Sequence, residues 1–360
     1  QSTLPLRQPR EDHHMKLTRR AIFLAATAAM IAPMGAMAQD LPRNIRMVIG
    51  SNSTGGDTYQ SAAILADALG EQLGVNIKVD AVGPSEGLKA LGRDSRGTTI
   101  MMFHDQAYLQ YLYGVQGTSD IFTEFAVGPT IAINPANAYL VPKNSPYQNM
   151  TDVLKAAADG TKVRVAIQAG GVSEIGFTAM KNAARLANPG SEANIVAVNT
   201  GSQSDKNQAL FDGLADVING SIQSNEQFTQ LPVEDQKSMR FIWLTSSPEA
   251  LGQAPEAGMG AMTRDMMLEY AAPKTSVPFD ETKDFVFDKE FFLIYNKDMD
   301  AGQMDAIDAA LAEIYAKGEI QKRQTEAFFT PDLRTRAEST AHMKEKNDAY
   351  AGIISTLKGN

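Results

Sequence analysis

The sequence has 360 residues, 43% of them hydrophobic, and a formal net charge of −9 at pH 7. An acidic chain lacks the basic face that contacts with nucleic-acid phosphates require, so we expect no nucleic-acid partner. The chain contains no cysteine, which excludes disulfides and thiolate metal sites.

The N-terminal region has the pattern of a secretory signal peptide. The basic stretch "MKLTRR" begins at Met15, an apolar run covers 21–32, and the small-residue site "AMA" ends at Ala38. The apolar run is shorter than the roughly 20 residues that a membrane-spanning helix needs. We therefore expect 15–38 to be a signal peptide that is cleaved before Gln39, after either Sec or twin-arginine export.

The expected cleavage defines a mature, exported chain. We expect residues 1–14 to be vector sequence or a misplaced start. Removal of 1–38 takes away five Lys/Arg and two Asp/Glu, which moves the net charge from −9 to about −12. The remaining length suggests two domains of roughly 150 residues each. Export without cysteine suits a bacterial periplasm, which is the location we predict.

Short apolar runs alternate with amphipathic segments along the mature chain. This alternation predicts α/β layers with mostly parallel sheets. From Met304 onward the periodicity is helical, with a break at 330–335. The predicted strands are 45–50, 75–79, 98–103, 163–168, 195–199, 215–220, 239–245 and 291–296.

We expect the chain to form two lobes by crossing over once and returning. The crossing is predicted near 134–142, and the return falls within the loop-rich stretch 262–290. The predicted boundaries are 39–138 for the first part of lobe 1, 139–262 for lobe 2, and 263–360 for the return to lobe 1.

Three segments place small residues between a strand and the start of a helix: "GSNSTGGDT" (50–58), "AGGVSE" (169–174) and "TGSQSD" (200–205). Glycine lets a ligand approach the backbone, and the first turn of a helix has unpaired N–H groups with roughly half a positive charge. Such a terminus binds phosphate or carboxylate without Lys or Arg, and open sheets place ligands at these strand ends. Ordinary turns with capped helices give the same pattern, so both interpretations stay open.

The first of these loops has part of a phosphate-loop spacing. Gly50 and Gly55 match G-x-x-x-x-G, but Gly56 and Asp57 stand where a mononucleotide site needs Lys and Ser or Thr. The dinucleotide pattern G-x-G-x-x-G is absent as well. Asp57 either caps the helix, which we favour, or accepts a hydrogen bond from a ligand. In both cases it argues against a polyphosphate and for a site that needs no lysine.

The sequence gives little support to catalysis. Adjacent residues of an extended chain point to opposite faces, so His104 and Asp105 do not form a ready relay, and His104 is instead a candidate ligand contact. No His/Asp/Glu cluster has metal spacing, so we expect no metal and no cofactor. "GVSEIG" (171–176) is one residue longer than the hydrolase motif G-x-S-x-G. A secreted hydrolase that uses Ser173 is kept as an alternative.

Several segments carry, in order, the motifs of one known family. "GGDTYQSAAILADALGEQLG" is similar to a GG-x-x-D-like loop followed by "ARLLAEHLGKQLG", and "YLVPKNSPYQNMTDVL" to "VVNPSSPVKTVAEL". "VAIQAGGVSEIGF" is similar to "YASSGVGSSPHL", and "VAVNTGSQSDKNQALFDGLADV" to "VPYKGSAPALTDLLGGQVD". Nearly all of the mature chain therefore resembles the substrate-binding proteins of tripartite tricarboxylate transporters, the TctC or Bug family.

The resemblance implies a two-lobed, type II-like periplasmic binding protein, in which each lobe is a mostly parallel sheet flanked by helices and a hinge joins the lobes. It implies a small carboxylate, held mainly by backbone N–H groups, hydroxyls and water, that is passed to membrane permease subunits without catalysis. We expect a monomer. The implied contacts are Ser51, Ser53, Thr54, Gly55, Gly56, Asp57 and Tyr59 near the first loop, Gln168, Ala169, Gly170, Gly171, Val172 and Ser173 in the second, and Gly201 and Ser202 in the third. His104, Gln106, Asn219 and Ser221 are suspected at the distal half of the ligand.

The chain departs from the family pattern at two loops. The first reads "SNSTGG" rather than "PFPPGG", and Glu174 stands where Pro-His is frequent. The identity of the acid therefore stays open. Besides the hydrolase, the alternatives are a binding protein that serves a sensor kinase and a receptor of the TAXI type of TRAP transporter.

Overall fold

The structure is a computed structural model that describes residues 41–358. The predicted signal peptide and the residues before it lie outside this range. Across the described range, no helix combines the length and the apolar character needed to cross a membrane.

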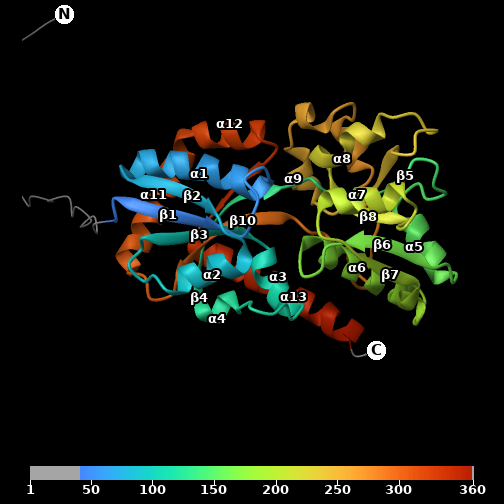
Figure 1. The fold of residues 1–360 in the computed structure, drawn as a ribbon, viewed down its shortest axis with the longest axis horizontal. Coiled ribbons are helices and arrows are strands. Elements are labelled where there is room, and N and C mark those ends of the chain that lie inside the picture. Colours follow the sequence, from blue (N-terminus) through green and yellow to red (C-terminus); the bar gives the residue numbers. More distant parts are fainter. Residues whose placement is uncertain (1–40, 359–360) are drawn as a thin grey trace, which may run out of the picture. The chain divides into compact units, whose positions relative to one another are not determined.

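Strands and helices alternate along the chain, as the sequence pattern predicts (Figure 1). The strands are β1 (Asn44–Ile49), β2 (Asn76–Ala81), β3 (Thr99–His104), β4 (Phe125–Asn134), β5 (Asn137–Pro142), β6 (Val163–Ile167), β7 (Ile195–Asn199), β8 (Val217–Ser221), β9 (Met239–Leu244), β10 (Lys289–Asn296) and β11 (Thr330–Arg334). The helices are α1 (Asp57–Leu73), α2 (Pro84–Gly92), α3 (Gln106–Leu112), α4 (Ile121–Glu124), α5 (Met150–Ala158), α6 (Val172–Ala187), α7 (Gln203–Phe211), α8 (Ile222–Thr229), α9 (Pro248–Gly252), α10 (Arg264–Leu268), α11 (Ala301–Lys317), α12 (Glu319–Glu326) and α13 (Arg336–Lys358), with the short 3-10 helices η1 (Ser191–Asn194) and η2 (Glu256–Met259).

The first sheet has six strands in the order β11-β4-β10-β3-β1-β2. β1 pairs in parallel with β2 and β3, and β10 lies antiparallel between β3 and β4 (Figure 1). β11 is antiparallel to β4 at the edge. Four of the six strands thus share one direction, which confirms the mostly parallel sheet.

The second sheet has five strands in the order β7-β6-β8-β5-β9. β6 is parallel to β7 and β8, whereas β5 is antiparallel to β8 and β9. The chain passes from the first sheet to the second between Asn134 and Asn137, and it returns between Leu244 and Lys289. The lobe boundaries given above stay predictions, because packing joins both sheets into one compact unit.

Alternate residues of the central strands pack on opposite faces of the sheet. In β1, Ile45 and Met47 belong to the apolar cluster that includes α1 and α11, whereas Val48 belongs to the cluster that includes Leu88 of α2. This alternation follows from the period of two of an extended chain. It places helices on both faces of the sheet and holds the strand ends in fixed positions.

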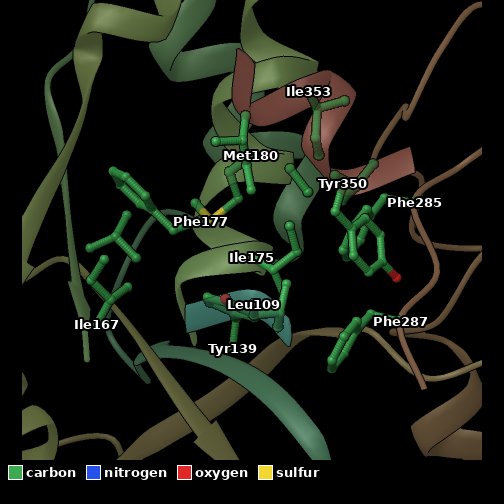
Figure 2. Close-up of a cluster of buried hydrophobic side chains, with 14 of the residues drawn as sticks. Leu109, Tyr139, Ile167, Ile175, Phe177, Met180, Phe285, Phe287, Tyr350 and Ile353 are labelled. Carbon is green, nitrogen blue, oxygen red and sulfur yellow. The ribbon is translucent and has the colours of Figure 1, made fainter. Parts of the chain in front are cut away.

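One apolar cluster is shared by elements of both sheets (Figure 2). The ring of Tyr139 in β5 stacks on Trp243 of β9 at 5.0 Å, and both are fully buried. The ring of Tyr350 in α13 lies 5.9 Å from Phe285 and 6.0 Å from Phe287, in the segment that returns to the first sheet. The C-terminal helix therefore packs against the returning segment and against α6.

All eight predicted strands are present, but the prediction omitted β4, β5 and β11. The sequence predicts a break between helices at 330–335, whereas this stretch contains the strand β11. Pro331 obscured it, because proline removes one ladder hydrogen bond and is confined to edge strands, strand starts and bulges. β11 is such an edge strand.

Candidate ligand-binding site

A cavity of about 580 Å³ is lined by residues that belong to both sheets and their helices. The start of α1, His104 at the end of β3, and Lys289 at the start of β10 contribute from the first sheet. The start of α6, Lys206 of α7, and Asn219 of β8 contribute from the second. The predicted placement of the loops at strand ends explains this convergence, because those ends meet at one edge of each sheet.

Two helices begin at this cavity, each after a glycine. One packs with the first sheet and the other with the second. Gly56 is the N-cap of α1 and Gly171 is the N-cap of α6, and neither helix has a side-chain cap. In α6 the N–H of Glu174 donates to the carbonyl oxygen of Gly171 at 3.0 Å, whereas no hydrogen bond is made by the N–H groups of Val172 and Ser173 to other described residues. Such first-turn N–H groups can bind a ligand, and both helix dipoles favour an anion. Helices α7 and α8, by contrast, are capped by the hydroxyls of Ser202 and Ser221.

Hydroxyl groups hold the two glycine loops in shape. The Oγ of Ser173 accepts a hydrogen bond from the N–H of Gln168 and donates to its carbonyl oxygen, both at 2.8 Å. Gly170 has φ of 81°, a conformation that favours glycine. In the first loop, Ser51 accepts from the N–H of Ser53 and Ser53 accepts from the N–H of Gly55. These hydroxyls shape the loops through the backbone.

Asp57 does not cap α1, which corrects the favoured interpretation of this residue. Its Oδ2 forms an ion pair with the Nζ of Lys289 at 2.6 Å and accepts a hydrogen bond from the Nδ2 of Asn134 at 2.7 Å. Burial raises the pKa of Asp57, but Lys289, His104 and the hydrogen bonds from Lys289 and Asn134 lower it to about 2. The lysine of β10 outcompetes the helix N–H groups because it is a full charge in direct contact.

This ion pair predicts a pH-dependent contribution to stability. A depressed carboxyl pKa stabilises the folded state above the ordinary pKa of 3.8, and this contribution is lost as the pH falls toward about 2. We expect Asp57→Asn to lower the free energy of unfolding by about 2 kcal/mol at pH 6, and the deficit to shrink below pH 4. Urea unfolding from pH 6 to pH 3 measures it.

The matched control for that measurement is Asp67→Asn. Asp67 lies on the same helix and pairs with Arg323 at the surface, where an ion pair contributes little. The ion pair between Asp57 and Lys289 would not have the stabilising role described if Asp57→Asn lost no more unfolding free energy than Asp67→Asn, or if its loss grew as the pH fell.

Lys206 is a second lysine in the cavity wall, and its side chain is nearly inaccessible, with the residue 5% exposed. Its Nζ donates to the Oδ1 of Asn219 at 3.0 Å, and no carboxylate among residues 41–358 lies within ion-pair distance of it. Burial, and then the charge of Lys289, lower the pKa of Lys206 to about 8. Neither lysine was among the predicted contacts, and a site that needs no lysine stays a prediction.

His104 lines the cavity in its neutral form. Burial, and then Lys289, hold its pKa well below 6.5. Its Nδ1 accepts a hydrogen bond from the N–H of Gln106 at 3.3 Å. Asp105 turns the other way and contacts Lys346 and Tyr108, as expected for adjacent residues. Within the described chain neither His104 nor His342 is hydrogen-bonded to Ser173, so the hydrolase alternative gains no support.

The cavity brings together most, but not all, of the predicted contacts. Ser51, Ser53, Gly170, Gly201 and Ser202 do not line it, and Thr54 and Tyr59 line a neighbouring surface pocket of about 440 Å³. The contact of each with a ligand stays a prediction. The predicted residues that line the cavity are Gly55, Gly56, Asp57, His104, Gln106, Gln168, Ala169, Gly171, Val172, Ser173, Asn219 and Ser221.

Sequence reasoning missed the two lysines for different reasons. Lys206 lies three and four positions before Ala209 and Leu210, which are buried, so helical spacing was an available signal for its inward position. Lys289 begins a strand that is antiparallel to β3, which brings it beside the end of β3. The direction of a strand is not visible in its apolar pattern.

Comparisons with known proteins identify the fold. Models of known protein families and curated proteins give no match. Among solved structures, MatC from Rhodopseudomonas palustris with bound malate has a TM-score of 0.62 and 13% identity, over 87% of this chain and 99% of that chain. A second R. palustris protein, solved with adipate, has a TM-score of 0.63 and 15% identity, over 87% and 99%. A TctC solute-binding protein from Polaromonas, without ligand, has a TM-score of 0.60 and 15% identity, over 87% and 98%.

The similarity to this chain extends over almost the entire length of each of these three structures. The protein therefore has the two-lobed α/β fold of the solute-binding proteins, which confirms the predicted fold class. At identities of 13–15% the likeness establishes the fold and leaves the ligand to be argued from the residues of the cavity.

Proposed function

We propose that the protein is a solute receptor of the TctC or Bug family that binds a small organic acid between its lobes. The observation that carries the proposal is the pair of uncapped helices α1 and α6, which begin at Gly56 and Gly171 and face one cavity from different sheets. Two such termini present several N–H donors and two positive dipole ends to one anion. A carboxylate fits this arrangement without any metal or nucleotide.

The similar structures support a dicarboxylate as the first class to test. One was solved with malate and another with adipate, both of which carry two carboxylates. Several motifs in order support the same family, including the loops around Gly56, Gly171 and Gly201. The order of the motifs, the fold and the chemistry of the cavity together support a dicarboxylate ligand.

The proposed mechanism is closure of two lobes around the acid. A ligand that contacts α1 on one side and α6 on the other stabilises the arrangement in which both helix termini reach it, and so shifts the population toward the closed state. Charge-assisted N–H bonds supply the affinity. The closed receptor then delivers its solute to permease subunits at the membrane, and it acts as a monomer in the periplasm, without catalysis.

A thermal-shift screen of the mature chain, followed by calorimetry, tests this function. The panel contains di-, tri- and aromatic carboxylates, each paired with its full methyl ester. We expect at least one acid to bind with micromolar or tighter affinity and its ester not to bind, because the ester removes the anionic oxygens. No response to any acid would contradict the proposal. Hydrolysis of the esters that disappears in Ser173→Ala would establish the hydrolase instead.

A further inference from the structure

The cavity contains two lysines, of which one has a carboxylate partner among the described residues and the other does not. Lys289 is neutralised by Asp57 at 2.6 Å. Lys206 is as deeply placed in the wall, but its Nζ contacts only the neutral amide of Asn219 among residues 41–358. A buried ammonium group without a counter-ion destabilises a folded protein unless something else requires it. A ligand group that brings negative charge is such a requirement.

A chain of hydrogen bonds holds Lys206 in this position. The Nδ2 of Asn219 donates to the Oδ1 of Asn137 at 2.9 Å, and the Nδ2 of Asn137 donates to the Oγ1 of Thr245 at 2.8 Å. The hydroxyl of Thr245 donates in turn to the carbonyl oxygen of Phe287 at 3.1 Å. Because each amide nitrogen is committed in this direction, the Oδ1 of Asn219 must face Lys206.

The chain of amides has two consequences for the lysine. It presents an acceptor to one N–H of the ammonium group and leaves the others for the cavity, since an ammonium has three donors. It also includes residues of both segments that connect the two sheets. Asn137 follows the first connection, and Thr245 and Phe287 belong to the second. The position of Lys206 is therefore fixed relative to the segments that join the lobes.

We propose that Lys206 binds a second anionic group of the ligand, and that it makes the receptor select dianionic over monoanionic acids of similar size. This rests on the proposed function, in which the termini of α1 and α6 hold the first carboxylate. Lys206 belongs to α7, a third helix, so the second anionic group binds to a different helix from α1 and α6. Asp57 neutralises Lys289, so Lys206 is the cation in this wall with charge left for the ligand.

The test compares each acid with its half-ester on two proteins. Malate, succinate and adipate, their monomethyl esters, and the monocarboxylates acetate, butyrate and hexanoate are titrated calorimetrically into the wild-type chain and Lys206→Met. We expect the wild type to bind its best diacid about 100-fold more tightly than the monomethyl ester. In Lys206→Met the diacid should weaken to within about threefold of the ester, while the ester itself changes little.

Lys162→Met is the matched control, because Lys162 is an exposed lysine near the start of β6. It makes the same charge change away from the cavity and should keep the full preference for the diacid. Ligand-free Lys206→Met should melt no lower than the wild type, since the substitution removes an uncompensated buried charge. A lower melting temperature with an unchanged preference would assign Lys206 to structure alone and overturn the inference.

The remaining outcomes separate the inference from the proposed function. If the wild type binds monocarboxylates as tightly as diacids, or if Lys206→Met keeps the preference, the inference fails while the receptor function stands. If the wild type binds none of these acids and none in the larger panel, the proposed function fails and the inference fails with it.

Discussion

Replacing Gly171 by leucine is expected to abolish carboxylate binding, by at least about 100-fold, in a protein that remains folded. Gly171 has φ of −141°, an extended conformation that any residue adopts. A Cβ at this position would lie 3.4 Å from the Cδ of Gln106, which also lines the cavity. The backbone therefore accepts a side chain, and the leucine fills the space in front of the N-terminus of α6, which denies the anion its N–H donors.

Calorimetry with the best acid of the panel measures this loss, and circular dichroism with thermal melting verifies the fold. The matched control is Gly252→Leu, at the end of α9, where a Cβ meets no atom within 4 Å and which does not line the cavity. It should bind like the wild type. Unchanged affinity of Gly171→Leu would remove this loop from the site.

The substitution Lys346→Met is expected to produce the largest loss of stability. The Nζ of Lys346 in α13 lies 2.5 Å from a carboxylate oxygen of Asp105 and 2.5 Å from one of Glu290, which are 0% and 1% exposed. Removing the shared cation leaves two buried carboxylates with less compensation, although Arg334 still contacts Glu290 at 2.8 Å. Breaking a buried pair in this way costs about 3–5 kcal/mol of unfolding free energy.

The pH dependence gives this prediction a signature. Burial raises the pKa of Glu290, but Lys346, His342 and Arg334 lower it to about 2, so its contribution to stability is present above the ordinary pKa of 4.5 and is lost as the pH falls toward about 2. The Lys346→Met variant lacks part of this stabilisation. The difference in unfolding free energy between the variant and the wild type should therefore shrink at acidic pH. Lys344→Met, exposed on the same helix, is the control. A deficit below about 1 kcal/mol would contradict the role of the network.

The network also matters for the site, because its members are neighbours of cavity residues. Asp105 follows His104, and Glu290 follows Lys289, and the N–H of Glu290 donates to the Oδ2 of Asp105 at 2.7 Å. Lys346 thereby ties α13 to the end of β3 and the start of β10, from which two cavity side chains project. Through these contacts the C-terminal helix is joined to the residues next to His104 and Lys289 in the cavity wall.

Eight of the eleven strands in the described residues could be predicted because their signal is local. Apolar runs such as 98–103 and 239–245 bury both faces, and period and length suffice to find them. The glycine loops at Gly56 and Gly171 could be predicted for the same reason, since a strand, small residues and a helix start are contiguous. β4 and β11 were missed because each contains a proline, Pro129 and Pro331, and a sheet tolerates proline only at an edge, a strand start or a bulge, which are properties of the whole sheet. β5 was missed as well, because it lies within the stretch predicted as the crossing between lobes.

The charges of the site could not be predicted, because their meaning depends on partners far away in the sequence. Asp57 was read as a helix cap, whereas its partner is Lys289, 232 positions later. Lys206 depends on Asn219, which in turn depends on Asn137. Electrostatic roles of this kind require the sheet order and the strand directions before any of them can be assigned.

A crystal structure of the mature protein with its best-binding acid tests the central claim most directly. We expect one carboxylate within hydrogen-bond distance of backbone N–H groups at the starts of both α1 and α6, that is, near Gly56 and Gly171 at the same time. An acid bound outside this cavity, or one that contacts only one of the two helices in a closed protein, would contradict it.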